Sequence, residues 1–236
     1  MVWLLLIGLG ATWLAHTAPF PFLLDYGFRS RAVWKMPTRP GDRVVYLTFD
    51  DGPNPDATPA LLDVLRANDA RATFFVIDRY ITEDTAPIVA RMAAEGHDVA
   101  LHSDQRELMF LTPDALAEHL GQAARHIQEI TGRPPCAAFR PHGGWRGGNM
   151  FRGLARLGYR LVGWGWNLWD WNWFRRRRAE TIVPRLLENV DNGEIIVIHD
   201  GHHRNPRADR RYAVETVERL VPALEARGFR FGTICE

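Results

Sequence analysis

Residues 44–77 read VVYLTFDDGPNPDATPALLDVLRANDARATFFVI and contain one complete strand–helix–strand unit. The apolar runs Val44–Phe49 and Arg71–Ile77 predict two buried strands. Between them, Thr58 is predicted to cap a helix that has Pro59 at its first position and leucines along one face. Strands joined through a helix usually run parallel, so this unit predicts an α/β fold.

The same alternation of strands and helices continues along the chain. Further strands are predicted at Asp98–Leu101, Ala137–Phe139, Arg160–Val162, Glu194–Ile198 and Arg230–Thr233. Further helices are predicted to end before Gly96 and to span 112–131, 149–157, 179–190 and 209–226. Seven strands with helical connections predict a parallel sheet, either open or closed into a barrel.

Length and composition favour one globular domain and disfavour some classes of partner. The chain has 236 residues, of which 46% are hydrophobic and 24% charged. A net charge of +1 disfavours nucleic acid as a partner, because nucleic-acid binding normally requires a basic excess. The two cysteines, Cys136 and Cys235, are too few for a disulfide framework. They are able to form one bridge, although their spacing does not argue for it.

The N-terminus is apolar, with Asp25 as its first charged side chain. Its length lies between that of a signal-peptide core and that of a spanning helix, and Pro19 would break its second half. We predict a hydrophobic signal or anchor segment over 1–24, retained rather than cleaved, a linker over 25–40 and a catalytic domain over 41–236. The alternative is a buried N-terminal arm of the domain.

Residues of catalytic type follow the predicted strands at five places. These are Asp50 with Asp51, His102, Arg140, the stretch Trp164–Asp170, and His199. Because active sites of parallel α/β folds gather at the carboxyl ends of the strands, we expect these residues to converge. One polar residue after a strand is explained by the ordinary polarity of loops, but five such residues after different strands are not easily explained in that way.

Two of these places suggest a specific chemistry. Asp50 and Asp51 leave the strand in different directions, so one carboxylate can bind a metal while the other acts as a base. Five tryptophans lie within the ten residues 164–173, too many for all of them to be core in so short a loop. Sugar rings stack on exposed tryptophan, so a glycan platform is one interpretation and partial core packing is the other.

The motif Thr-Phe-Asp-Asp-Gly-Pro at Thr48–Pro53, followed by Arg-Ala-Thr-Phe-Phe at Arg71–Phe75, closely resembles the polysaccharide deacetylases, the NodB homology domain of carbohydrate esterase family 4. The resemblance runs from about Gly41 to Thr233. It implies an α/β fold, a distorted (β/α) barrel of about seven parallel strands. It also implies hydrolysis of N-acetyl or O-acetyl groups on glycans with a divalent metal, often zinc.

The resemblance also implies roles for individual residues. The catalytic residues would be Asp50 as general base, His199 as general acid, Arg140 to orient the base and Asp170 to tune the acid. The metal ligands would include Asp51 and His102. The residues that bind the substrate would be Trp171 in the acetyl pocket, Gly143 through its backbone N–H, and Trp169.

One departure from the family pattern affects the metal site. Arg106 stands where the family has its second histidine ligand, which puts a permanent cation in place of a neutral nitrogen donor. Asp104, Glu107 or His142 are candidates to replace it, and the sequence does not choose among them.

We predict metal-dependent hydrolysis of acetyl groups, as C–N amides, on a carbohydrate polymer, with a divalent metal that the resemblance implies is zinc. The alternatives are a catalytically weakened or inactive glycan-binding relative, and a hydrolase of a non-sugar amide. The expected partners are an acetylated glycan and, through the N-terminal segment, a membrane. Basic residues after that segment, Arg29, Arg31 and Lys35, suggest a cytoplasmic domain. A polymer substrate instead suggests a domain outside the cytoplasm, in the cell envelope. We give the substrate more weight than the charges and expect the envelope.

Overall fold

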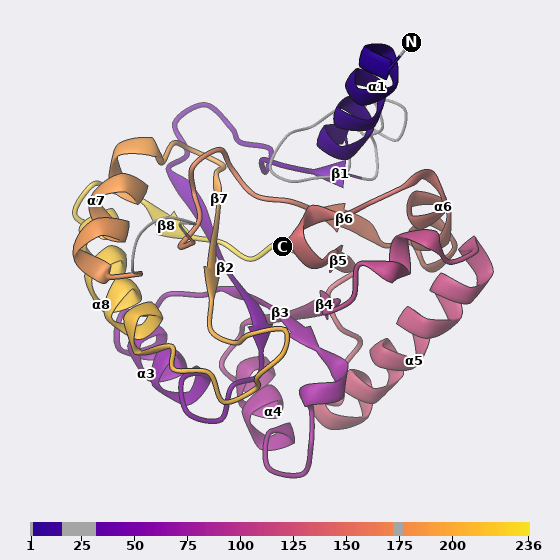
Figure 1. Ribbon diagram of the computed structural model, residues 1–236. Helices are drawn as coiled ribbons and strands as arrows, with labels where there is room; N and C mark the ends of the chain where they lie inside the picture. The colour runs from indigo at the N-terminus through magenta and orange to yellow at the C-terminus, as the bar shows by residue number, and fades with distance from the viewer. Residues whose placement is uncertain (1, 16–31, 172–176) are drawn as a thin grey trace.

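The structure, a computed structural model, describes residues 2–15, 32–171 and 177–236 (Figure 1). Its strands are β1 Ala32–Val33, β2 Val44–Gly52, β3 Thr73–Ile77, β4 Asp98–His102, β5 Ala138–Arg140, β6 Arg160–Val162, β7 Ile195–His199 and β8 Arg230–Phe231. Its α-helices are α1 Val2–Ala15, α3 Thr58–Ala67, α4 Ala86–Ala94, α5 Pro113–Thr131, α6 Gly148–Leu157, α7 Ala179–Asn189 and α8 Arg211–Glu225. Short 3₁₀ turns lie at η2 Asp78–Tyr80, η3 Glu107–Phe110 and η4 His142–Gly144.

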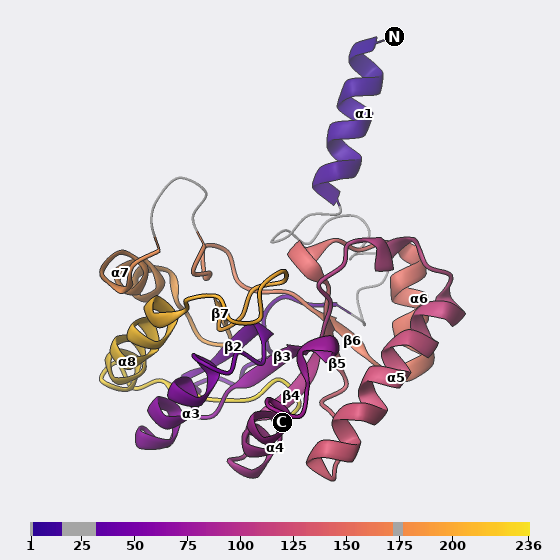
Figure 2. The same ribbon diagram turned by 60° about the horizontal axis from the view of Figure 1, so that its bottom comes forward.

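The strands form one curled sheet in the order β1-β6-β5-β4-β3-β2-β7, and β8 pairs with β2. Every strand pairing in the described chain is parallel. The helices from α3 to α8 cover the outside of the curl, as Figures 1 and 2 show. The predicted α/β fold, a distorted barrel of seven parallel strands, is therefore confirmed.

Two irregular segments link the ends of the curl. Lys35 forms an antiparallel bridge with Glu194, and the N–H of Met36 donates to the carbonyl of Gly193 at 2.8 Å. Trp169 forms a parallel bridge with Val197 of β7. The two-residue strand β1 and the bridge that follows it lie within 25–40, the segment predicted to be a linker, so residues 32–36 belong to the sheet.

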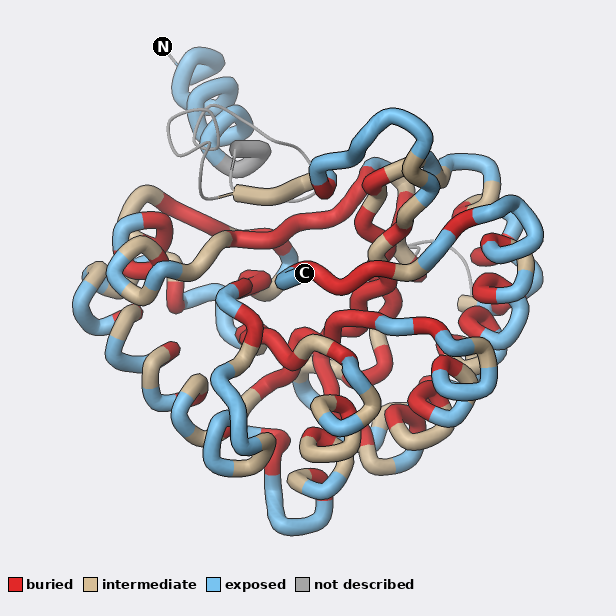
Figure 3. Tube along the Cα trace, turned by 180° about the vertical axis from the view of Figure 1, so that it is seen from behind, coloured by how far each residue is buried: buried red, intermediate tan, exposed pale blue. Residues whose placement is uncertain are grey.

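Both faces of the sheet are covered by apolar side chains. Phe49 and Phe74 of β2 and β3 stack at 4.8 Å on the outer face, within the core beneath the helices. Phe75 and Ile234 belong to a second cluster inside the curl. Figure 3 shows the strands buried and the outward faces of the helices exposed. Burial on both faces explains why the strands are apolar along nearly their whole length.

The helix boundaries correct the predicted cap at Thr58 and show another at Thr112. The hydroxyl of Thr112 accepts a hydrogen bond from the N–H of Ala115 at 3.2 Å and caps α5. Thr58 is not the cap of α3 but lies inside its first turn. The turn is organised by Asn54, whose side-chain oxygen accepts hydrogen bonds from the N–H groups of residues 56 and 57. An Asx turn therefore takes the place of the predicted threonine cap.

Cys136 and Cys235 form a disulfide, with their Cα atoms 5.7 Å apart. The bond joins the start of β5 to the segment that follows β8, and Ile234 beside it fills the inner cluster. The two cysteines are 99 residues apart in sequence. Only the curl of the sheet brings them together, which is why their spacing did not predict the bond.

The helix α1 exposes apolar side chains on all sides. Trp3 is 77% exposed and Leu4 75% exposed. Within the described residues, no helix is both long enough and apolar enough to cross a membrane. The rest of the predicted anchor, residues 16–24, lies outside the described part of the chain, as do Arg29, Arg31 and Trp173.

Candidate functional site

The carboxyl end of β2 carries two buried carboxylates that face different partners. Asp50 is 2% exposed and Asp51 is 4% exposed. Asp51 has a φ of 70°, an uncommon conformation for a residue with a side chain. The turn directs Asp50 toward Arg140 and Asp51 toward His102. The predicted divergence of the two carboxylates is therefore present in the geometry.

Arg140 holds Asp50 from the end of β5. Its Nη1 donates to Asp50 Oδ1 at 2.6 Å and to the hydroxyl of Thr48 at 2.8 Å. Its Nε and Nη2 donate to the carbonyls of Val162 and Gly163 at 3.2 and 2.8 Å. The side chain is fully buried. With bonds on every side, the guanidinium cannot rotate, and the charge-assisted bond fixes the direction of the Asp50 carboxylate.

His199 lies at the end of β7 as the register partner of Asp50 on β2. Its Nδ1 bonds to Asp170 Oδ1 at 2.7 Å, and its backbone N–H donates to Asp170 Oδ2 at 2.9 Å. The hydroxyl of Tyr212 also donates to Asp170 Oδ2, at 2.7 Å. Asp170 therefore has both oxygens occupied, and its bond to Nδ1 leaves Nε2 of His199 as the nitrogen that can exchange a proton.

The charges of this pair stabilise one another. Burial raises the pKa of Asp170, but the charge and hydrogen bond of His199 outweigh it and lower that pKa well below its usual value. Burial lowers the pKa of His199, but Asp170 outweighs burial and the pKa of His199 is raised. His199 therefore keeps its proton to a higher pH than an ordinary histidine, as a general acid requires.

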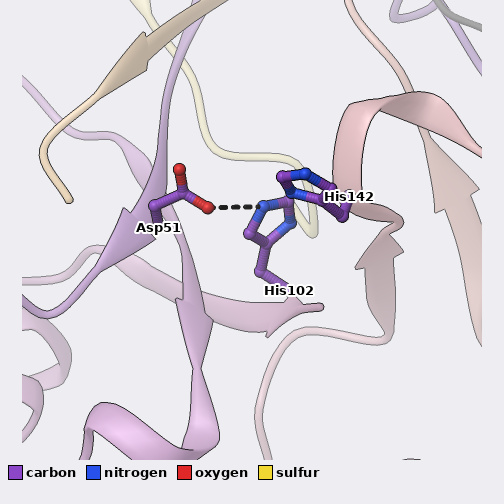
Figure 4. Close-up of side chains that lie close together, drawn as sticks. All are labelled: Asp51, His102 and His142. Atoms are coloured by element: carbon purple, nitrogen blue, oxygen red, sulfur yellow. Dashed lines mark ion pairs between the residues drawn. The ribbon is translucent and has the colours of Figure 1, made fainter. Parts of the chain in front are cut away.

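Figure 4 shows a second cluster, made of Asp51, His102 and His142. One ligand-type atom from each lies within 4.8 Å of the others. Nε2 of His102 is 3.2 Å from Asp51 Oδ1, and its Nδ1 bonds to the carbonyl of Arg140 at 2.7 Å. A backbone carbonyl can only accept, so Nδ1 carries the proton when the ring is neutral. Nε2 then presents a lone pair, the arrangement common in metal-bound histidine.

The charges of the cluster fit a cation. Oδ1 of Asp51 is buried and accepts no hydrogen bond from the described residues. Burial lowers the pKa of His102, but the carboxylates of Asp50 and Asp51 outweigh it and raise that pKa. Burial lowers the pKa of His142 to about 3, so this ring is neutral near pH 7. A carboxylate and two imidazoles form a donor set that suits zinc or a similar divalent ion.

His142 is the one of the three proposed replacement ligands that joins this cluster. Asp104 is paired with Arg79 at 2.6 Å, and Glu107 is exposed in η3. The guanidinium of Arg106 lies over the ring of Trp145 at 5.5 Å. His142 reaches the site because His102 and Arg140 are register partners on β4 and β5, so the turn after β5 begins beside the end of β4.

The predicted substrate residues lie on two sides of this region. Trp171 meets the ring of His199 edge to face at 5.7 Å, and Trp169 stacks on Trp171 at 5.0 Å. Trp164 is 4% exposed and belongs to the inner core, so the tryptophans are divided between core and site. Gly143 is exposed, with a φ of 58° in the turn η4.

Sequence reasoning missed Thr48 and Tyr212. Thr48 is the first residue of the motif Thr48–Pro53, but only the buried position of Arg140 shows that its hydroxyl accepts a hydrogen bond from that side chain. Tyr212 belongs to the first turn of α8, and its contact with Asp170 spans 42 residues. No local pattern marks such a contact.

The chain is similar in sequence to known carbohydrate deacetylases. A family model described as polysaccharide deacetylase matches residues 38–162. A chitooligosaccharide deacetylase of Sinorhizobium fredii is 37% identical over 198 residues, which cover 78% of this chain and 87% of that protein. A peptidoglycan-N-acetylglucosamine deacetylase of Bacillus cereus is 30% identical over 203 residues, with coverage of 86% and 91%.

A solved structure adds a similarity in three dimensions. It is a family 4 acetyl xylan esterase from Clostridium thermocellum in complex with a cobalt ion. The TM-score is 0.71 at 28% identity, and the match covers 81% of this chain and 88% of that one.

The hydrogen bond between His199 and Asp170 generates a prediction about protonation. Replacement of Asp170 by Asn removes the negative charge that raises the pKa of His199, so burial then dominates and that pKa falls. NMR titration of the His199 imidazole measures the shift. The control is Tyr212→Phe, which removes a hydrogen bond from Asp170 but keeps its charge, so the pKa of His199 should stay raised. An unchanged pKa in Asp170→Asn would contradict the assignment.

Proposed function

Because the chain belongs to the polysaccharide deacetylase family, we propose that it hydrolyses acetyl groups, held as C–N amides, on a carbohydrate polymer. The observation that carries the proposal is the pairing of Asp50 with His199 across β2 and β7. Each has a partner of opposite charge, Arg140 for Asp50 and Asp170 for His199. The relatives named for chitooligosaccharide and for peptidoglycan N-acetylglucosamine favour the amide over the ester.

In the proposed reaction, Asp50 accepts a proton from the attacking water, whose oxygen bonds to the acetyl carbonyl carbon. His199 donates a proton to the amide nitrogen as the carbon–nitrogen bond breaks, so acetate and a free amine are released. Arg140 keeps the Asp50 carboxylate in position, and Asp170 keeps His199 protonated. The N–H of Gly143 is the proposed donor to the carbonyl oxygen as it gains negative charge.

We also propose that Asp51, His102 and His142 hold a divalent metal ion, and that zinc is the ion this donor set favours. The chemistry that such an ion supplies is Lewis-acid polarisation of the acetyl carbonyl and of water. The buried Asp51 Oδ1 and the lone pair of His102 Nε2 face each other and need a cation or a proton between them. Trp171, beside His199, and Trp169 behind it are proposed to bind the acetylated sugar.

The acid–base assignment predicts the effect of two substitutions. Asp50→Asn and His199→Ala should each lower turnover of acetylated chitooligosaccharides by roughly a hundredfold to ten-thousandfold, the usual worth of a positioned base or acid. Their effects should not add fully in the double variant, because both residues serve one reaction. The wild-type rate should fall at high pH as His199 loses its proton, and the raised pKa of His199 moves that fall upward.

The chain offers a matched control for His199. His126 on α5 forms a similar pair with Asp78 at 2.7 Å, but both side chains are 41% exposed and the pair is open to water. His126→Ala should leave turnover unchanged. Undiminished turnover in His199→Ala would remove His199 from the role of acid.

The proposed metal ligands predict a binding measurement that is independent of activity. His142→Ala should weaken zinc affinity, measured by competition with a chromophoric chelator. The loss should exceed the roughly 10- to 100-fold seen when a residue that only hydrogen-bonds to a metal ligand is removed. His126→Ala is the control, since His126 belongs to the exposed pair with Asp78 and not to the cluster. Equal affinity in His142→Ala and wild type would show that the third ligand lies elsewhere.

We propose finally that the N-terminal segment holds the domain at the outer face of a membrane. Two observations support this location. The disulfide between Cys136 and Cys235 is typical of an oxidising compartment, and α1 exposes apolar side chains that lipid can cover.

A test of location traps the protein in acid directly from the cells that make it and adds a maleimide reagent. Neither cysteine should react until a reductant is added, because both are held in the disulfide. Protease added to intact spheroplasts should also digest the domain. Rapid labelling of both thiols, together with protection from protease until lysis, would exclude the proposed location.

A further inference from the structure

Trp166 exposes a large aromatic ring in the loop that also carries Asp170. Within the described chain, the large apolar side chains that are exposed outside α1 are Phe110, at 75%, and Trp166, at 60%. Of its neighbours along the chain, Leu168 is fully buried and Asn167 is polar. Within the described residues, the strongly exposed apolar surface at this place is therefore the indole ring of Trp166, bordered by the half-buried Trp169.

The turn that carries this ring is fixed on several sides. The N–H of Leu168 donates to the carbonyl of Gly165 at 3.2 Å, and the N–H of Gly165 donates to the carbonyl of Ile195 at 2.9 Å. Asn167 has a φ of 61°, and its side-chain oxygen accepts a hydrogen bond from Arg185 of α7 at 3.2 Å. A positive φ at the third residue of a turn places the second residue, Trp166, at its outer corner.

Gly165 shows how closely this turn is packed. A Cβ atom at this position would lie 2.2 Å from the carboxylate of Glu194 and 2.6 Å from Leu168. Arg185 also donates to the carbonyl of Trp169. The ring of Trp166 is thus presented on a preformed turn, and a ligand that stacks on it has little backbone to order.

A continuous series of rings connects Trp166 to the proposed general acid. Trp166 meets Trp169 edge to face at 5.9 Å, Trp169 stacks on Trp171 at 5.0 Å, and Trp171 meets His199 at 5.7 Å. Trp169 and Trp171 are half-buried. This series of rings therefore runs from the proposed general acid, His199, to the exposed ring of Trp166.

We propose that Trp166 is a stacking platform for a sugar of the acetylated glycan that is remote from the sugar being deacetylated. The proposal rests on the proposed function and deepens it, because it names a contact with the polymer away from the reacting sugar. The C–H face of an N-acetylglucosamine ring is apolar and about as wide as an indole, while its hydroxyl edge stays in water. A protein partner normally covers roughly 800 Å² on each side, so one exposed indole ring bordered by a half-buried one favours a sugar over a protein surface.

The kinetic test compares a long substrate with a short one. In Trp166→Ala, the KM for chitopentaose should rise about tenfold, which corresponds to the loss of one well-placed aromatic contact. The kcat should not change, because a remote contact binds the ground state and the transition state equally. The hydrolysis of an aryl acetate, which does not reach the turn, should stay at the wild-type rate. Trp166→Phe should retain most of the affinity, and Phe110→Ala should behave as wild type.

A binding measurement separates failure of this inference from failure of the proposed function. Calorimetric titration of chitopentaose into Asp50→Asn and into Asp50→Asn with Trp166→Ala reports affinity without turnover. Weaker binding in the double variant supports the platform even if the wild type has no deacetylase activity. Equal affinity in both variants, or an equal loss of rate on chitopentaose and on the aryl acetate, would overturn it and leave Trp166 for a different partner.

Discussion

A buried guanidinium organises the centre of this protein. Arg140 enters the curl from β5 and bonds to Thr48 and Asp50 on β2 and to the carbonyls of Val162 and Gly163. A fully buried cation is costly unless every donor is satisfied and a counter-charge is near. Asp50 supplies that charge, and the ring of Phe75 lies 4.0 Å from the guanidinium. The direction of the proposed base therefore follows from the burial of one arginine.

The same residue reaches the proposed metal cluster through its backbone. The carbonyl of Arg140 accepts the bond from Nδ1 of His102 and so sets which nitrogen faces Asp51. Two residues further on, the chain supplies His142. The proposed base and the proposed ligands are thus positioned by the side chain and the main chain of one strand end. We expect substitutions in the two groups to be energetically coupled rather than additive.

The sequence alone predicted the site residues that directly follow strands along the chain. It did not predict the contacts that depend on which residues of neighbouring strands pair. Asp50, Asp51 and His199 follow apolar strands, so their convergence could be predicted from strand ends alone. The choice of His142 over Asp104 and Glu107 required the pairing of β4 with β5, which no local pattern encodes. The disulfide, the contact of Tyr212 with Asp170 and the two-residue β1 were missed because they depend on distant partners.

Residues 164–173, which are rich in tryptophan, show the same limit of prediction from sequence. An irregular loop has no periodicity, so composition could not separate the core residue Trp164 from the exposed Trp166. That separation comes from the left-handed Asn167 and from the bonds that tie the loop to β7 and α7.

The position of His142 has a consequence for how this protein can diverge. The third imidazole of the cluster comes from the turn after β5, so the loop between β4 and α5 supplies no atom to the cluster after His102. That loop carries Arg106 and Phe110, both exposed. Within that loop, the hydroxyl of Ser103 accepts a hydrogen bond from the N–H of His142 at 3.1 Å and so helps to place the third imidazole. Substitutions beyond Ser103 in this loop therefore remove no donor atom of the cluster, whereas substitutions in the turn after β5 can remove one.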